Sequence, residues 1–364
     1  MTTDHRCRVG LIGLGEVGII HLEAYVASER VEVVAIAEVD PARRSNNLMS
    51  SDAAVYDCHR ALLQNERLDM VCVLTPAATH RPIAMDCADA GVPTLCEKPL
   101  AHTLDDAKEM RDYFSKASVP LFYGSSYRHL PAIRAARDII ASGVIGSVKL
   151  IREFITGGRG PDAQRPYSVM HYPEGYPGGT GMGLMDHGIH LLDIMPWLLD
   201  SPVTAAWGRG NRTGEPLTTE FATLQFANSA VGQLIYEDGS WTTALPMEGL
   251  FSKGAGWDFA GPVPPGQWDR EPATIHVHGT LGALRICHYA NALFLNDATG
   301  VREIKLAGEP APAHFRHQIE AFAADLTRGS SPSSSVDDGI RALEILENIY
   351  RSRFEEIGSG NAFR

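Results

Sequence analysis

Short apolar runs alternate with longer amphipathic stretches along residues 7–124. The apolar runs are rich in Val, Ile and Leu and predict strands at 8–12, 31–37, 69–74, 94–96 and 121–123. Between them, apolar residues spaced three and four apart predict helices over 16–28, 79–90 and 104–116. Strands that are apolar on both faces and alternate with helices are typical of a parallel sheet covered on both sides.

The pattern changes after residue 127, where strands become the commoner element. Strands are predicted at 147–156, 203–210, 218–227, 230–238, 274–279, 283–287, 292–296 and 301–306. Short turns such as Ala227-Asn228-Ser229 join neighbouring strands, which favours a largely antiparallel sheet. Helices are predicted over 131–142, 184–199, 313–327 and 336–357. The long segment 241–271 contains three tryptophans, and a loop of that length is usually functional or part of an interface.

Size and composition limit the class of protein. A chain of 364 residues is too long for one ordinary core, so we expect two domains. The net charge of −12 disfavours nucleic acid and anionic membranes as partners, because both bind mainly through clustered Lys and Arg. No apolar run approaches the roughly 20 residues of a membrane helix, and no signal-peptide pattern is present. The six cysteines are scattered, which favours reduced core thiols and a cytoplasmic location.

A glycine-rich turn follows the first predicted strand. Gly13-Leu14-Gly15-Glu16-Val17-Gly18 has the spacing G-x-G-x-x-G, in which the glycines permit a tight turn, close approach to a pyrophosphate, and close packing of helix on strand. Glu38 ends the second strand, 20 residues after Gly18, where a carboxylate can accept hydrogen bonds from ribose hydroxyls. We therefore expect NAD in preference to NADP. The alternative is a solvated Glu38, with Arg43 or Arg44 holding a 2′-phosphate.

Further cofactor contacts are expected at the carboxyl ends of the later strands, because ligands of open α/β sheets bind there. Thr75 and Pro76 follow one such strand, and Glu97-Lys98-Pro99 follows another. For Thr75 and Pro76 the alternative is a plain strand-ending turn. The expected cofactor-binding set comprises Gly13, Gly15, Glu16, Val17, Gly18, Glu38, Thr75, Pro76, His80, Glu97 and Lys98.

Two segments carry candidate catalytic groups. Lys98 stands at the edge of the sheet, and partial burial shifts the pKa of a lysine readily, so that it can donate or relay a proton. The alternative is a solvated surface lysine. Asp186, His190 and Asp193 are spaced i, i+4, i+7, which places them on one face of a helix. Oxidation of an alcohol needs a base for the hydroxyl proton, and a histidine oriented by a carboxylate provides one.

Two other interpretations of this segment remain open. Asp186 can be a helix cap and His190 a satisfied core histidine. Alternatively, Asp186, His187 and His190 can bind a metal, but no third soft ligand is near, so we expect no metal.

Together these motifs resemble the Gfo/Idh/MocA family of oxidoreductases, which includes inositol dehydrogenase and glucose–fructose oxidoreductase. The resemblance covers nearly the whole chain and rests on the glycine turn, Glu97-Lys98-Pro99 and the spacing Asp186-x-x-x-His190-x-x-Asp193. Tyr127-Arg128, Gly279-Thr280-Leu281-Gly282-Ala283 and Asp338-Gly339-Ile340-Arg341 also fit the usual pattern of the family. Each motif is weak alone, whereas the Lys–Asp–His combination is specific.

The resemblance implies an α/β Rossmann dinucleotide-binding domain plus an α+β domain with a large open, mostly antiparallel sheet. Residues 1–125 would form the NAD-binding domain and 126–335 the substrate and oligomerisation domain. Residues 336–364 would carry a C-terminal helix that packs back on the Rossmann domain. The open sheet face would make a homodimer or homotetramer contact.

By position, the resemblance implies Lys98, Asp186 and His190 as the catalytic set. Its substrates are sugars, polyols or their derivatives, for which we expect contacts from Tyr127, Arg128, Arg159, Tyr176, Asp186, His187 and His190. Arg159 suits a carboxylate or phosphate, with a solvated surface arginine as the alternative, and Tyr176 suits a sugar face or an interface. The segments 159–177 and 241–271 depart from the family pattern and leave the substrate open.

The expected function is that of an NAD-dependent dehydrogenase. It would transfer hydride from a secondary alcohol of a sugar, sugar derivative or cyclitol, with Lys98 and His190 in acid–base roles. One alternative is a redox-neutral enzyme that cleaves glycosides with tightly bound NAD. Another is a non-catalytic NAD-sensing protein, against which the intact catalytic set argues.

Overall fold

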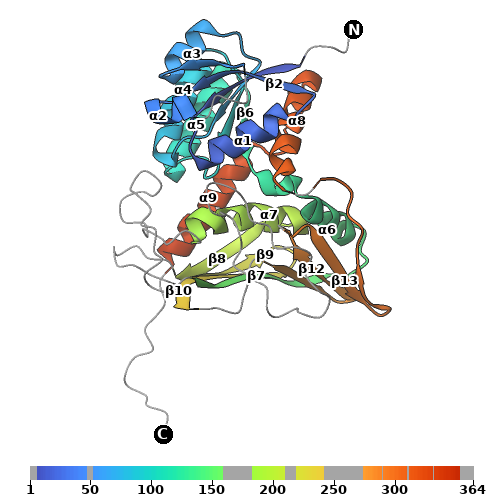
Figure 1. The fold of residues 1–364 in the computed structure, drawn as a ribbon. Coiled ribbons are helices and arrows are strands. Elements are labelled where there is room, and N and C mark those ends of the chain that lie inside the picture. The colour runs from blue at the N-terminus through green and yellow to red at the C-terminus, as the bar shows by residue number, and fades with distance from the viewer. Residues whose placement is uncertain are drawn as a thin grey trace, which may run out of the picture.

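The computed structural model describes residues 6–46, 52–158, 183–209, 219–241, 274–288, 290–309, 311–330 and 332–352. These residues form two domains, each built on one sheet (Figure 1). Helices surround the sheet of the first domain, and a layer of helices separates that domain from the sheet of the second. No described helix combines the length and apolar character needed to cross a membrane.

The first domain contains a six-stranded sheet in the order β3-β2-β1-β4-β5-β6, with every neighbouring pair parallel. Its strands are β1 (Cys7–Ile12), β2 (Val31–Ala37), β3 (Ala54–Tyr56), β4 (Met70–Val73), β5 (Thr94–Glu97) and β6 (Leu121–Gly124). Its helices are α1 (Glu16–Val26), α2 (Pro41–Asn46), α3 (His59–Asn65), α4 (His80–Asp89) and α5 (Leu104–Ala117), with the short turn η2 (Ala77–Thr79) before α4. This strand order is that of the Rossmann fold, and the predicted parallel sheet is confirmed.

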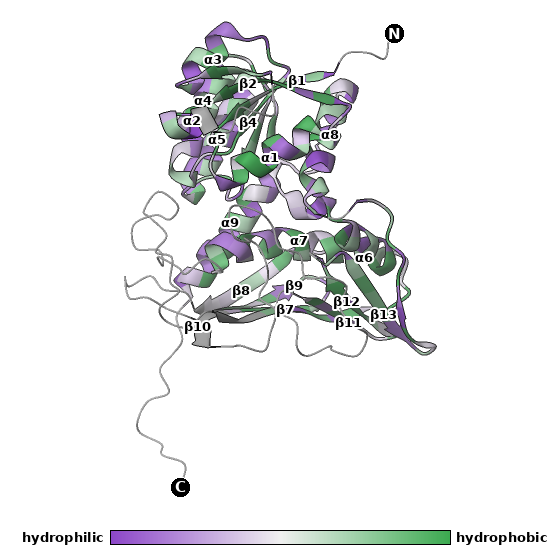
Figure 2. Cartoon of the chain, viewed as in Figure 1, coloured by the Kyte–Doolittle hydropathy of each residue, from purple (hydrophilic) through white to green (hydrophobic). Residues whose placement is uncertain are grey.

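The strands of this sheet are mostly hydrophobic, whereas the surrounding helices mix hydrophobic and hydrophilic residues (Figure 2). Val9 and Leu11 on β1 are fully buried, as expected for a central strand covered on both faces. The sequence did not predict α2, β3 or α3. A three-residue edge strand and two short helices offer too few positions for a periodic pattern to be recognised.

The second domain contains an eight-stranded sheet in the order β14-β13-β12-β11-β7-β10-β9-β8. The strands are β7 (Val148–Gly158), β8 (Val203–Arg209), β9 (Thr219–Phe226), β10 (Val231–Trp241), β11 (Ile275–Gly279), β12 (Gly282–Cys287), β13 (Ala292–Asp297) and β14 (Gly300–Glu303). The pairs are antiparallel except that β7 and β10 are parallel, which confirms a mostly antiparallel sheet. The last strand was predicted to reach residue 306 but ends at Glu303.

One face of this second sheet is covered by helices that lie towards the first domain (Figure 1). They are α6 (Pro131–Ala141), α7 (Ile189–Leu199) and α9 (Val336–Arg351). The helix predicted from residue 184 is divided, because η5 (Leu184–Gly188) is a single π-helical turn that leads into α7. Another short turn, η3 (Ser126–His129), connects β6 to α6.

The last two helices tie the domains together. Helix α8 (Ala313–Arg328) packs on α1, β2 and η3, and its Phe322 stacks on Phe122 of β6 with ring centroids 4.6 Å apart. Its sequence lies in the range 126–335, yet its apolar face covers the first domain. Helix α9 packs on α5 and β6 on one side and on α7 and β8 on the other.

Candidate active site

The glycine turn connects β1 to α1, and its three glycines have different surroundings. Gly13 has φ +100°, a conformation that favours glycine. A Cβ on Gly18 would lie 2.2 Å from the carbonyl oxygen of Gly13, so only glycine lets the helix approach the turn. A Cβ on Gly15 would meet only one atom within 4 Å, the Arg43 Nη1 at 3.9 Å. The space beside Gly15 is therefore open for a pyrophosphate at the N-terminus of α1.

Glu38 lies against this turn at the end of β2. Its buried carboxylate accepts hydrogen bonds from the Leu14 N–H at 2.6 Å and the Asp40 N–H at 2.9 Å. Arg44 donates to the carbonyl oxygens of Glu38 and Val39, so its guanidinium is engaged by the backbone. A carboxylate held beside the glycine turn fits the ribose end of NAD.

The loop after β5 is fixed by two buried histidines. His21 of α1 lies 3.1 Å from Glu97 Oε1, while Glu97 Oε2 accepts from the Lys98 N–H at 2.8 Å. His80 is buried with Nε2 2.6 Å from the Thr75 carbonyl oxygen and Nδ1 3.0 Å from that of Pro99. Burial lowers the pKa of His80. His80 and Glu97, both expected to contact the cofactor, therefore hold the loops that carry Thr75 and Lys98.

Lys98 crosses from the first domain to the second. Its Nζ donates to Asp186 Oδ1 at 2.8 Å and to the Asp186 carbonyl oxygen at 3.2 Å. The side chains of Lys98 and Asp186 are 17% and 25% exposed, so the pair is accessible to a small molecule. Two of the three predicted catalytic residues are thus in direct contact, and the Asp186 carboxylate engages Lys98.

The π-helical turn that carries Asp186 is anchored from β9. Glu220 accepts from the Leu184 N–H at 2.8 Å and from the Tyr350 hydroxyl at 2.7 Å. A Cβ on Gly183 would lie 2.1 Å from Glu220 Oε2, so the preceding glycine is required for this contact. Burial raises the pKa of Glu220, although both hydrogen bonds oppose the shift. π-Helical turns occur frequently at functional sites.

His190, on the first turn of α7, is stacked on Tyr127 of η3. The two rings are nearly parallel, with an interplanar angle of 4° and centroids 3.9 Å apart. Burial, reinforced by the charge of Lys98, holds the pKa of His190 well below its usual range. Its imidazole is therefore neutral near pH 7, the form in which one ring nitrogen can accept a hydrogen bond.

Arg128 was expected to contact substrate, but its buried guanidinium is occupied by protein groups. It donates to both carboxylate oxygens of Asp193, at 2.9 Å and 2.5 Å, and pairs with Asp338 of α9 at 3.1 Å. Ser125 also bonds Asp193, which shared a predicted helix face with His190. These contacts join η3, α7 and α9, which indicates a structural role for Arg128 in place of the expected substrate contact.

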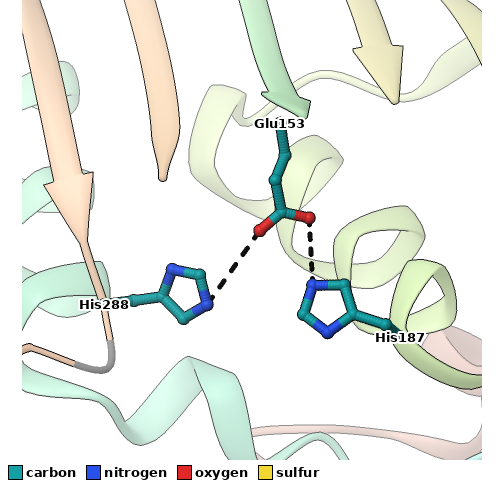
Figure 3. Close-up of side chains that lie close together, drawn as sticks. All are labelled: Glu153, His187 and His288. Atoms are coloured by element: carbon teal, nitrogen blue, oxygen red, sulfur yellow. Dashed lines mark hydrogen bonds and ion pairs between the residues drawn. The ribbon is translucent and has the colours of Figure 1, made fainter. Parts of the chain in front are cut away.

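His187 belongs to a buried group that the sequence did not predict (Figure 3). Its Nε2 lies 3.0 Å from Glu153 Oε2 on β7, and that same oxygen accepts from the Tyr236 hydroxyl at 2.9 Å. His288, just after β12, brings its Nε2 to 4.0 Å from Glu153 Oε1. The sequence contained one indication that Glu153 faces the core. Glu153 lies two residues after the buried Ile151 on the same strand, so both side chains point to the same face of the sheet.

The other predicted residues have simpler outcomes. Glu16 is exposed on the first turn of α1, and Val17, Thr75 and Pro76 are half-buried near the glycine turn and the end of β4. Arg159 and Tyr176, with most of the segment 241–271, lie outside the described residues.

Family models match both domains. One described as an oxidoreductase family with an NAD-binding Rossmann fold matches residues 7–125, and one described as the C-terminal alpha/beta domain of an oxidoreductase family matches residues 137–357. The chain belongs to the Gfo/Idh/MocA oxidoreductase family. It is therefore an oxidoreductase with an NAD-binding Rossmann domain, and the predicted family is confirmed.

Several known proteins are similar over nearly the full chain. D-apiose dehydrogenase of Paraburkholderia graminis is 30% identical, over 97% of this chain and 89% of that protein. The rhizopine catabolism protein MocA of Rhizobium meliloti is 27% identical, over 94% and 93%. The solved structure of aldose–aldose oxidoreductase from Caulobacter crescentus, complexed with glycerol, has a TM-score of 0.75 at 21% identity, covering 95% of this chain and 97% of that one. At that identity the likeness supports the fold.

Proposed function

We propose that the protein is an NAD-dependent dehydrogenase that oxidises a secondary alcohol of a sugar, sugar derivative or cyclitol. The observation that carries the proposal is the contact of Lys98, at the cofactor edge of the first domain, with Asp186 of the second, beside a neutral His190. An ammonium and an imidazole at this junction suit removal of a hydroxyl proton. The names of the sugar-linked relatives, among them D-apiose dehydrogenase, support this substrate class.

In the proposed reaction, His190, Lys98 and Asp186 have different roles. His190 accepts the proton of the substrate hydroxyl, and its ring plane is kept in place by the stacked Tyr127. Lys98 donates a hydrogen bond to the same oxygen and stabilises the negative charge that develops there. Asp186 holds the Lys98 ammonium in position through the 2.8 Å ion pair.

The glycine turn and Glu38 are the residues that would hold the dinucleotide. Bound NAD supplies a hydride acceptor for the alcohol carbon. The buried Glu38 carboxylate would repel a 2′-phosphate, which supports NAD in preference to NADP. We also propose that the sheet face opposite α6, α7 and α9 pairs with a second copy of the chain.

The test is NADH formation across a panel of sugars, sugar acids, inositols and glycosides. With a substrate found, Lys98→Met and His190→Gln should each lower kcat by about 100-fold to 10,000-fold and leave the Kd of NAD within a few-fold. Lys108→Met and His59→Gln are matched controls, because these side chains form exposed or partly exposed ion pairs with Glu344 and Asp86.

Two results would contradict the proposal. Turnover near the wild-type value in both active-site variants would remove their catalytic roles. No NADH or NADPH from any alcohol, together with glycoside cleavage by protein that retains NAD through purification, would establish the redox-neutral alternative instead.

A further inference from the structure

Glu153, His187 and His288 converge from three separate elements in the interior of the second domain (Figure 3). Glu153 lies on β7, His187 on the π-helical turn, and His288 directly after β12. All three side chains are fully buried, at 0–1% exposure. One nitrogen or oxygen atom of each lies within 4.8 Å of the corresponding atoms of the other two.

The contacts of the two Glu153 carboxylate oxygens fall on either side of the spacing found between metal ligands. Zinc ligands at about 2.0–2.2 Å from the ion in a tetrahedron are separated from one another by roughly 3.3 Å. Here Glu153 Oε2 and His187 Nε2 are 3.0 Å apart, and Glu153 Oε1 and His288 Nε2 are 4.0 Å apart. The second distance exceeds a hydrogen bond, and among the described residues no hydrogen bond reaches Glu153 Oε1.

We propose that Glu153, His187 and His288 bind a divalent transition-metal ion, for which Zn²⁺ is the best chemical fit. Two imidazoles and one carboxylate form a ligand set that proteins use for zinc. A cation between them would also compensate Glu153 Oε1, the buried carboxylate oxygen that no hydrogen bond among the described residues reaches, which is otherwise a costly arrangement. The expectation of no metal was derived from Asp186, His187 and His190, whereas this set uses only one of those residues.

Neighbouring groups are placed as outer ligands require. The Tyr236 hydroxyl donates to Glu153 Oε2, and the Tyr127 hydroxyl lies 3.4 Å from His187 Nδ1, the nitrogen opposite the proposed ligand atom. Such contacts fix the orientation of metal-binding histidines and carboxylates. Because Tyr127 also stacks on His190 and His187 directly follows Asp186, the ion would be a positioning element for the proposed catalytic site.

The experiment measures zinc binding directly and is independent of any dehydrogenase activity. Purified full-length protein is stripped with a chelator, and Zn²⁺ is then titrated against a chelating dye. We expect one tightly bound zinc per chain, and more than about a 100-fold loss of affinity in Glu153→Gln and in His288→Gln, because even outer-ligand changes cost 10–100-fold. His278→Gln is the matched control, since His278 is a half-buried histidine on the adjacent β11 and lies outside the set.

A second measurement covers the case in which either variant fails to fold. Crystals of wild-type protein soaked in Zn²⁺ should give an anomalous-scattering peak between the three side chains. Wild-type protein that binds no zinc, variants that bind it as tightly as wild type, or a zinc peak only elsewhere would each overturn the proposal.

Discussion

Of two alanine substitutions in the glycine turn, one should lower the stability of the fold and the other should weaken cofactor binding. In Gly18→Ala, the new methyl group would lie 2.2 Å from the Gly13 carbonyl oxygen, a backbone atom. Contacts below 3.0 Å essentially never occur, so α1 has to move away from the turn by nearly 1 Å. Overpacking of this kind costs about 1–3 kcal/mol of folding free energy.

Gly15→Ala is the matched substitution. Gly15 is extended, with φ −67° and ψ −174°, and the added methyl group would meet only the Arg43 side chain, at 3.9 Å. Folding free energy should change by less than about 1 kcal/mol, because the reduced entropy of the unfolded chain offsets the poorer helix cap. The methyl group would occupy the space beside which the pyrophosphate binds. Loss of one charge-assisted hydrogen bond there, worth about 1.5–3 kcal/mol, raises the Kd of NAD by roughly 10-fold to 150-fold.

Urea unfolding of the cofactor-free protein and calorimetric titration with NAD separate the two effects. Gly18→Ala should shift the unfolding midpoint, and Gly15→Ala should shift only the binding isotherm. Gly15→Ala protein that binds NAD as tightly as the wild type, or Gly18→Ala protein that unfolds at the wild-type urea concentration, would contradict these expectations.

Three further outcomes are expected. Glu38→Ser removes the carboxylate beside the glycine turn and should lower the NAD over NADP preference at least about 10-fold in binding titrations; an unchanged ratio would exclude Glu38 as the discriminating group. Arg128→Met leaves Asp193 and Asp338 without their buried cation and should cost about 3–5 kcal/mol by urea unfolding, whereas a loss below about 1 kcal/mol would show that the ion pairs are dispensable. Burial lowers the pKa of His129 to about 3, so below about pH 6.5 the unfolded chain binds a proton that the folded chain does not. The free energy of unfolding should therefore fall with acidification, by about 1.4 kcal/mol from this group at one pH unit below 6.5. His129→Asn should reduce the slope of the free energy of unfolding against pH. The charged or titratable groups that face His129 are Arg128, Arg134, His317 and Asp325.

The parts of the fold that the sequence predicted are those with strong periodicity. The apolar run of β2 and the amphipathic pattern of α5 can be recognised in the sequence, because burial requires apolar residues at regular positions along the whole element. The short β3 does not, since three residues carry no period and the position of the strand depends on pairing with β2. The π-helical turn before α7 was predicted as ordinary helix because its geometry depends on Glu220, a residue on another strand.

In the site, too, local motifs could be predicted from the sequence, whereas contacts between distant elements could not. Lys98 and Asp186 could be selected from local motifs, and the structure brings them into contact. The occupation of Arg128 by Asp338 could not be predicted, because it requires α9 to return to η3. The proximity of Glu153 and His288 likewise depends on the order of strands in the sheet, which could not be predicted from a single sequence.

The packing of α8 on the first domain also affects when that domain can complete its core during synthesis of the chain. Strands β1 to β6 leave the ribosome long before Phe315, Ile319 and Phe322, which complete the apolar cluster around α1. Domains generally fold as units while they are synthesised, yet this one lacks part of its core until the whole second sheet has been translated. During that interval its uncovered apolar surface is a natural target for chaperones. Because α8 follows β14 in the sequence, the order of elements along the chain determines when the apolar cluster around α1 can be completed.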